Sequence, residues 1–451
     1  IFFQSSAIGG IKDQIGLLDL LITHVTGVPD LDLFEQLQVV VPNQAQAIWL
    51  KDQLTIRQGI CANIDFVVLL GPVLQNIYQA NNHDVEFYDF NQAKFLIYNL
   101  LCAERINCAD ADELNNYIYA ADGSLDRLKA FQLASQLQSI FHEYLYLRTV
   151  ELINLERANF KTWQKILWRK LLVALNEKKT FLDIYRYFAE IDLERVDLKL
   201  PRQLFIFGLT SLYPSQLEII LKLSSKINVY WYYQPCSHQY YGDLLSDKAR
   251  AKIEQRLLRK PDLSLDDLYL NDGNPLLANL GQQSRELIEL LRANDVQVYD
   301  FNPAEFNPSQ VGVPQTILEI IQDDIRQIKY RIRPEYRVHA TSDYYADPLN
   351  LAQSTPEAIY DLPAQQLSLK INVAHNRMRE VQIMFNEVVA ILDKNPTSKL
   401  SDILITAPDI DDYAAYLSAV LDNESLTKAD GTTYKLLYNL TGNRRHKSYK
   451  I

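Results

Sequence analysis

Short apolar runs alternate with longer segments of helical spacing along much of the chain, which is the pattern of a parallel α/β sheet. The clearest unit spans residues 204–236. We predict a strand buried on both faces over Leu204–Phe207, a helix over Gln216–Leu223 with Ser211 as its N-cap, and a returning strand over Ile227–Tyr233. Ligands of such sheets bind beyond the carboxyl ends of the strands, so the residues after Phe207 are where a ligand is expected.

The same pattern extends toward the beginning of the chain. Ile1–Gln4 and Leu37–Val41 are predicted strands, and a predicted helix over Asp13–Thr23 follows the first of them. A polar loop over Pro42–Gln46 and a helix over Ala47–Leu54 follow the second strand. We therefore predict an α/β fold class.

Residues 89–198 are helical in pattern and rich in Tyr, Leu, Gln and Asn, which predicts an all-helical insertion in the sheet domain. The predicted helices include Ala93–Glu104, Ser124–Leu147 and Lys161–Leu175. Six apolar residues recur at helical spacing in the second of these and are predicted to be core: Phe131, Leu133, Leu137, Phe141, Tyr144 and Leu145.

A second α/β unit is predicted toward the end of the chain. Four prolines punctuate residues 334–363, which predicts an irregular linker that separates this unit from the rest. The unit has predicted strands at Leu367–Val373 and Ile403–Thr406, each followed by a predicted helix, at Arg379–Leu392 and Tyr413–Leu421. The predicted domains are residues 1–88 and 199–333 (sheet), 89–198 (helical insertion), 334–366 (linker) and 367–451 (a second sheet domain, incomplete at Ile451).

Composition narrows the class of protein. The chain has 451 residues, and its formal net charge of −11 argues against nonspecific coating of nucleic acid but leaves room for a local basic groove. Its four cysteines have no CxxC spacing, which indicates reduced thiols in a cytoplasmic protein. No apolar run approaches the roughly 20 residues needed to span a bilayer, so no membrane partner is expected.

The two sequence features of a nucleotide-driven motor are missing from their expected places. The turn after the first strand, Ser5–Asp13, holds two glycines and Lys12 but not the spacing of a phosphate-binding loop. The residues after Phe207 include no carboxylate to hold Mg²⁺. Asp409, Asp411 and Asp412 are close in sequence, but acids before a helix are expected to be solvated or to cap it. No catalytic or metal site is predicted.

Several motifs recur in order along the chain in one known family. They are Gly59–Phe66 (GICANIDF), Leu204–Pro214 (LFIFGLTSLYP), Pro235–Cys236 with Tyr241–Asp243, Gly273–Gly281 (GNPLLANLG), Arg379–Val381 and Asp402–Tyr413 (DILITAPDIDDY). With these motifs the chain resembles the N-terminal half of RecC, the gamma chain of exodeoxyribonuclease V, the RecBCD complex. The resemblance implies a superfamily-1 helicase-like fold that has lost its ATPase motifs.

The resemblance also implies a role in double-strand break repair by homologous recombination. A chain of this family is expected to hold RecB-like and RecD-like subunits, to split double-stranded DNA, to guide single-stranded DNA and to scan it for the Chi sequence. ATP and Mg²⁺ would be used by the partner subunits, with no cofactor in this chain.

In that family three segments form the surface that scans DNA. Carried over by motif position, the surface includes Pro42 and nine site residues: Gln44, Ile48, Val68, Leu74, Ser139, Ile140, His142, Glu143 and Arg148. Arg148 keeps the family's residue type and is expected to contact a phosphate, whereas Pro42, Ile48, Ser139 and His142 depart from it. The recognised DNA sequence therefore stays open.

Two other hypotheses differ in class. An active nucleotide-dependent chain of the AddB kind would need a phosphate-binding lysine, for which Lys12 is the only candidate. A pure protein scaffold would never contact DNA. Loss of ATP hydrolysis in Lys12→Ala would support the first, and DNA crosslinks that are lost in Arg148→Ala would count against the second.

Overall fold

The computed structural model divides into two compact units, residues 1–42 with 58–306 and residues 43–57 with 307–451. It describes residues 2–4, 16–28, 35–108, 110–157, 162–175, 177–237, 239–245, 252, 273–294, 296, 298–300, 316–329, 368–395, 397–424, 426–427 and 433–440. Lys12, the whole turn Ser5–Asp13 around it and the predicted linker at 334–363 lie outside these residues. None of the described helices is long and apolar enough to cross a membrane.

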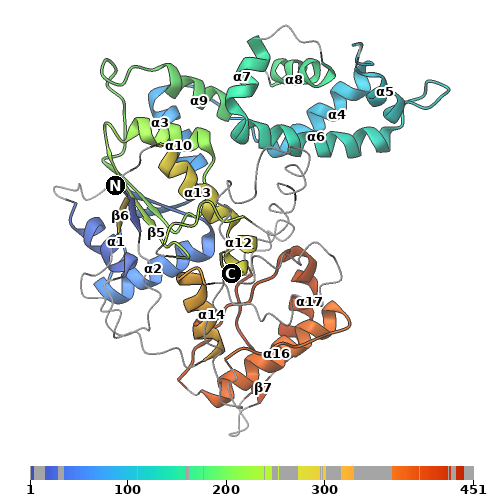
Figure 1. The fold of residues 1–451 in the computed structure, drawn as a ribbon. Coiled ribbons are helices and arrows are strands. Elements are labelled where there is room, and N and C mark those ends of the chain that lie inside the picture. Colours follow the sequence, from blue (N-terminus) through green and yellow to red (C-terminus); the bar gives the residue numbers. More distant parts are fainter. Residues whose placement is uncertain are drawn as a thin grey trace, which may run out of the picture. The chain divides into compact units, whose positions relative to one another are not determined.

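The first unit is built on a six-stranded parallel sheet (Figure 1). Its strands lie in the order β3-β2-β4-β5-β1-β6. Their bounds are β1 Phe2–Gln4, β2 Leu37–Val41, β3 Ile64–Val68, β4 Gln203–Phe207, β5 Asn228–Tyr233 and β6 Val298–Asp300. The predicted parallel α/β sheet is confirmed, with β4 and β5 within one residue of their predicted starts.

Helices cover the sheet because its strands are apolar on both faces. Leu204, Phe205 and Ile206 of β4 are fully buried, as predicted for a central strand. Ile206 and Trp231 share one core cluster with the helices of that face. These helices are α3 (Leu70–Asn81), α9 (Phe181–Glu190), α10 (Pro214–Leu223) and α13 (Gln282–Ala293). From α1 (Leu17–Thr26), His24 stacks on Tyr230 of β5.

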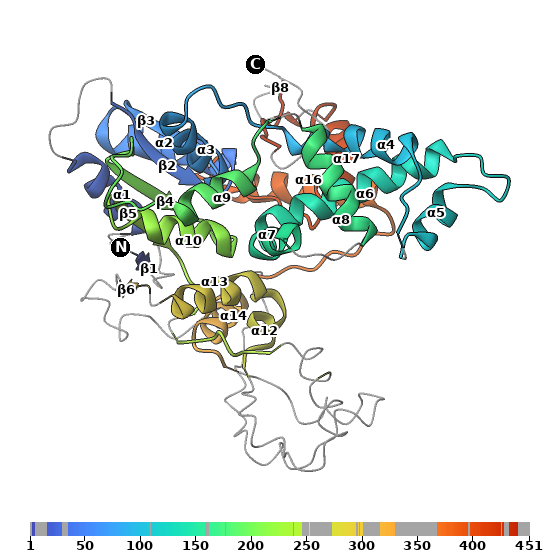
Figure 2. The same ribbon diagram turned by 90° about the horizontal axis from the view of Figure 1, so that it is seen from above.

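Residues 89–198, predicted to be a helical insertion, contain α9, which packs on the sheet, and five further described α-helices: α4 (Ala93–Ala103), α5 (Asp112–Ile118), α6 (Arg127–Leu147), α7 (Thr149–Arg157) and α8 (Trp163–Ala174). They share a second core cluster, and Figure 2 shows α4 beside α6. Leu137, Phe141 and Leu145 are buried there as predicted. Phe131 was wrongly predicted to be core: it is 37% exposed and meets Phe95 and Tyr98 at the surface.

Local capping explains two shifts from the predicted helix starts. α6 begins after Asp126 instead of at Ser124, because the Asp126 carboxylate accepts the backbone N–H groups of Leu128 and Lys129 at 3.1 Å. Ser211 is not the N-cap of α10, as was predicted. The helix begins at Pro214, whose fixed φ suits the first helical position, and Tyr213 is its N-cap.

Two of the recurring motifs are held by side-chain hydrogen bonds. The hydroxyl of Tyr241 hydrogen-bonds to that of Ser284 on α13, which also bonds to Tyr233 at the end of β5. All three side chains are buried, so the network links the turn to the strand and the helix. In the next motif, Asn274 caps α12 (Pro275–Leu280) by accepting the N–H of Leu277 at 3.1 Å.

The second unit is mainly helical in its described part. It contains α14 (Ile317–Arg326), α16 (Arg377–Lys394), α17 (Asp411–Leu421) and all but the last residue of α2 (Gln44–Gln58). Val381, Phe385 and Leu417 belong to a small core between α16 and α17. Its described strands are two-residue segments, β7 (Leu426–Thr427) and β8 (Thr433–Tyr434), which pair antiparallel.

The second βαβ unit predicted here is wrong in its strands. Residues 368–373 and 403–406 have no strand structure, although the helices that follow them are present as α16 and α17. Ile371, Val373 and Leu404 are 82%, 89% and 86% exposed. A strand needs a hydrogen-bonded neighbour, and no described strand pairs with either segment.

Candidate nucleic-acid interface

The candidate interface begins at the carboxyl edge of the sheet, where β3, β2 and β4 end side by side. β4 passes into Gly208 at φ +69°, a conformation that favours glycine. The Gly208 N–H donates to the carbonyl of Tyr232 at 2.9 Å, and the Trp231 indole donates to the carbonyl of Leu209 at 3.3 Å. These bonds tie the loop after β4 to β5. The loop contains no carboxylate, so it brings no negative charge to this edge.

Arg148 ends α6 as its C-cap, and its side chain is exposed. Its guanidinium lies 5.3 Å from the ring centre of Tyr144, and this cation–π contact helps to fix the side chain. Within the described ranges, no carboxylate forms an ion pair with Arg148. A guanidinium that is not held in a salt bridge can bind a phosphate without first breaking one.

The other predicted residues of α6 divide between two faces of the helix. Ser139, Ile140 and Glu143 are exposed on the side opposite the buried stripe, so they form one accessible face. His142 is half-buried instead, with its ring 6.0 Å from that of Phe90 and 5.2 Å from that of Tyr146. The helix therefore presents three of the predicted side chains to a ligand and holds His142 against its neighbours.

The segment after the Gly59–Phe66 motif places its two predicted residues differently. Val68 is half-buried at the end of β3 and is followed by Leu69, which is 51% exposed with φ +65°. Leu74 is fully buried in the core beneath α3. A side chain in that position stabilises the fold and is not accessible to a DNA strand, so it plays no part in the interface described below.

Gln44 and Ile48 lie one turn apart on α2, in the second compact unit. The helix begins three residues earlier than predicted, at Gln44, so the predicted polar loop is reduced to Pro42 and Asn43. Asn43 causes this early start, because its side-chain oxygen accepts the N–H of Gln46 at 2.9 Å. Gln44 and Ile48 are both exposed, and so is Trp49 beside them.

A stack of three aromatic rings, which was not predicted from the sequence, joins α6 to α9 and to the loop after β4. Tyr146 of α6 lies between Phe181 of α9 and Tyr213 before α10, with centroid distances of 4.5 and 5.0 Å and interplanar angles of 27° and 29°. The Ser215 hydroxyl donates to the carbonyl of Tyr146 at 2.9 Å. Burial, and then the neighbouring Tyr213, raise the pKa of Tyr146. The sequence offered one signal for this stack, a Tyr directly before Pro214 in a recurring motif.

One acidic group of these helices is engaged within the protein. Glu218 of α10 accepts the hydroxyl of Tyr185 on α9 at 2.5 Å. Burial and then this bond raise the pKa of Tyr185 to about 12. In the second unit, Asp409 accepts the N–H of Asp411 at 3.0 Å, in the first turn of α17, as predicted for an acid that caps the helix. Asp412 pairs with Arg377 at 2.7 Å. No described cluster of His, Cys, Asp or Glu could hold a metal ion.

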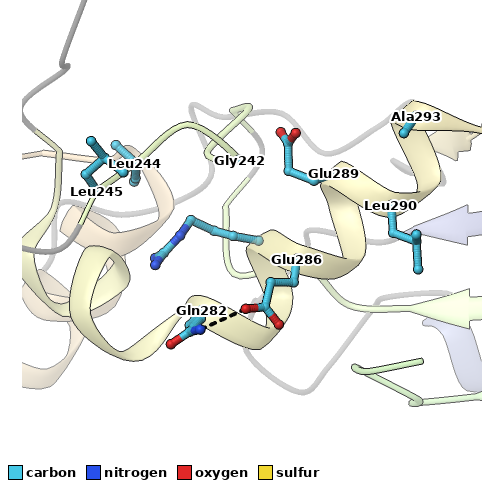
Figure 3. Close-up of a pocket in the computed structure, with 9 residues that line it drawn as sticks. Gly242, Leu244, Leu245, Gln282, Glu286, Glu289, Leu290 and Ala293 are labelled. Atoms are coloured by element: carbon cyan, nitrogen blue, oxygen red, sulfur yellow. Dashed lines mark hydrogen bonds between the residues drawn. The ribbon is translucent and has the colours of Figure 1, made fainter. Parts of the chain in front are cut away.

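An open cavity of about 610 Å³ lies elsewhere in the first unit, between α13 and the turn after β5. Figure 3 shows Gln282, Glu286 and Glu289 on α13, with Leu244 and Leu245 on the other side. Gln282 donates to Glu286 at 2.7 Å, and the Arg285 guanidinium donates to the carbonyl of Leu277 at 2.7 Å. Its polar groups bond within the protein, and none of the predicted site residues lines it.

Comparison with known proteins gives one consistent family. Residues 14–328 match the family model described as RecC, N-terminal domain. The protein named RecBCD enzyme subunit RecC from Escherichia coli K12 is 26% identical over 446 residues, which cover 91% of this chain and 37% of that protein. The Haemophilus influenzae protein of the same name is 21% identical, over 95% of this chain and 40% of that protein. The Mycolicibacterium smegmatis protein of the same name is 24% identical, over 86% of this chain and 32% of that protein. The chain thus spans about two fifths of the length of these relatives or less.

Proposed function

The chain belongs to the RecC family, and on that premise we propose that it is a non-catalytic, DNA-handling subunit of a helicase–nuclease for DNA repair. In this proposal RecB-like and RecD-like partners supply ATP hydrolysis, Mg²⁺ and nuclease chemistry. This chain holds those subunits, guides a single strand of the unwound duplex and scans it for Chi.

The observation that carries the proposal is the composition of the carboxyl edge of the sheet. A nucleotide-driven motor would place a Mg²⁺-binding carboxylate after a strand such as β4, whereas this chain places Gly208 to Tyr213 there. An exposed arginine, Arg148, ends the neighbouring α6, and α6 packs on α10, which follows that loop. The edge is suited to an extended polyanion with aromatic bases.

The face of α6 that carries Ser139, Ile140 and Glu143 would continue the contact along the strand. α6 has 21 residues and is therefore about 31 Å long. Hydroxyl, apolar and carboxylate side chains can distinguish bases when these are unstacked. Val68, and Gln44 and Ile48 on α2, are proposed to belong to the same function.

Binding of a labelled single-stranded oligonucleotide, measured by fluorescence anisotropy across a salt series, tests the proposal. We expect affinity that falls as salt rises, because phosphate contacts release counterions. Arg148→Ala should lower the slope of log K against log salt by about one. Arg195→Ala is the matched control. Arg195 pairs with Asp192 and precedes β4, so it lies toward the amino end of that strand and not at its carboxyl end. No binding at low salt would contradict DNA contact by this chain and favour a pure scaffold.

A further inference from the structure

We propose that Tyr213 is a base-stacking residue that works together with Arg148. This inference rests on the proposed function, because it names a contact for the single strand at the same edge of the sheet. The ligand is a nucleobase of single-stranded DNA, recognised by its flat π face and not by its hydrogen-bonding edge.

The position of Tyr213 is the first support. It is the last residue of the loop after β4 and the N-cap of α10, so it lies at the carboxyl edge where open α/β sheets bind their ligands. Its side chain is 36% exposed. The end of β3, with exposed Leu69, is two strands away in the same sheet, a spacing of about 10 Å. A strand of DNA crossing this edge would pass within reach of the ring.

The second support is that the ring is held from behind. Tyr213 stacks on Tyr146, which stacks on Phe181, and Phe181 is only 3% exposed. The three rings thus form a column from the core to the surface. On the backbone side, the carbonyl of Tyr213 accepts the N–H groups of Gln216 and Leu217 at 3.0 and 3.1 Å. A ring fixed in this way loses little conformational entropy when a base stacks on it.

The third support is a positive charge on the helix that holds the stack. Arg148 ends α6, two residues after Tyr146, so the two side chains leave the helix on different faces, Tyr146 toward Phe181 and Tyr213 and Arg148 into an exposed position. Its guanidinium already lies over an aromatic ring, that of Tyr144. Single-strand-binding proteins combine aromatic rings, on which bases stack, with cations that follow the phosphate backbone.

An oligonucleotide scan with single abasic sites tests this inference on the full chain. In the wild-type protein, removal of the base that stacks on Tyr213 should weaken binding about 5- to 100-fold. Tyr213→Ala should weaken binding of the intact oligonucleotide by a similar factor and should make that abasic position neutral. Tyr213→Phe should keep both the affinity and the abasic sensitivity, because the ring remains.

Two control variants separate stacking from other effects. Tyr117→Ala removes a ring that is 47% exposed on α5, and it should leave affinity and the abasic pattern unchanged. Arg148→Ala should weaken intact and abasic oligonucleotides equally. The inference is overturned if Tyr213→Ala keeps the wild-type abasic pattern while the wild-type protein still binds DNA, and the proposed function then stands. Absence of any binding by the wild-type protein overturns both.

Discussion

Two apolar runs of similar composition, one in each compact unit, adopt different structures. In the first unit, Leu204 to Phe207 forms β4, hydrogen-bonded to β2 on one side and β5 on the other. In the second unit, Ile403 to Thr406 forms no strand, and Leu404 is 86% exposed. The difference shows that apolar residues define a strand only when neighbouring strands satisfy the backbone and helices cover both faces.

The largest expected effect contrasts these two runs directly. Phe205→Ala removes a fully buried ring that stacks on Tyr230 at 5.3 Å, and it should lower the free energy of unfolding by about 3 to 5 kcal/mol. Leu404→Ala should change it by less than about 0.5 kcal/mol, because the side chain is exposed. Urea unfolding followed by circular dichroism measures both. Equal losses would mean that the exposed run is packed in solution.

A smaller effect is expected in the core between α16 and α17. Leu417→Ala should destabilise these helices by about 2 to 4 kcal/mol, since Leu417 is 5% exposed and belongs to their shared cluster. Hydrogen exchange should rise over Arg377–Lys394 and Asp411–Leu421, with the exchange of β4 as the internal reference. Tyr416→Ala is the matched control, because its ring is 37% exposed on the same helix. Unchanged exchange in α16 would refute the shared core.

The smallest effect compares two tyrosine–glutamate pairs, one from each unit. Burial and the bond to Glu218 raise the pKa of Tyr185 to about 12, so the folded state keeps a proton that the unfolded state loses near pH 10. Its contribution to stability is complete below about pH 10 and is lost as pH rises toward 12. The hydrogen bond to Glu380 raises the pKa of half-buried Tyr413.

Tyrosinate absorbance at alkaline pH measures these two titrations. The spectrum of each variant, Tyr185→Phe or Tyr413→Phe, is subtracted from that of the wild-type protein. The Tyr185 difference should develop near pH 12. The Tyr413 difference should develop above the ordinary tyrosine range as well. A Tyr185 difference centred on pH 10 would show that its bond to Glu218 is not kept in solution.

Residues near one another in sequence predicted most of the first unit. The apolar run of β4 and the helical spacing of Leu137, Phe141 and Leu145 depend on local pattern, and the structure agrees with them. The exposed face of α6 follows from the same spacing.

Features that depend on distant partners were beyond the sequence. Ser215 and Tyr146, which bond to each other beside the aromatic stack, are 69 residues apart, and no local pattern links them. Leu74 was predicted to be a site residue from its position relative to a motif, but its side chain is buried in the core. The strands predicted in the second unit failed for the same reason, since their partners cannot be deduced from their own residues.

The pairing of β1 has a consequence for how the protein is made. Phe2 pairs with Trp231 of β5 and with Val298 of β6, so the first strand has no hydrogen-bonded neighbour until about 230 further residues have been translated. At a synthesis rate of about 5 to 20 residues per second, that delay is on the order of 10 to 50 s. β1 therefore leaves the ribosome well before its partner strands. A chaperone that covers it during this interval would protect the nascent chain from aggregation.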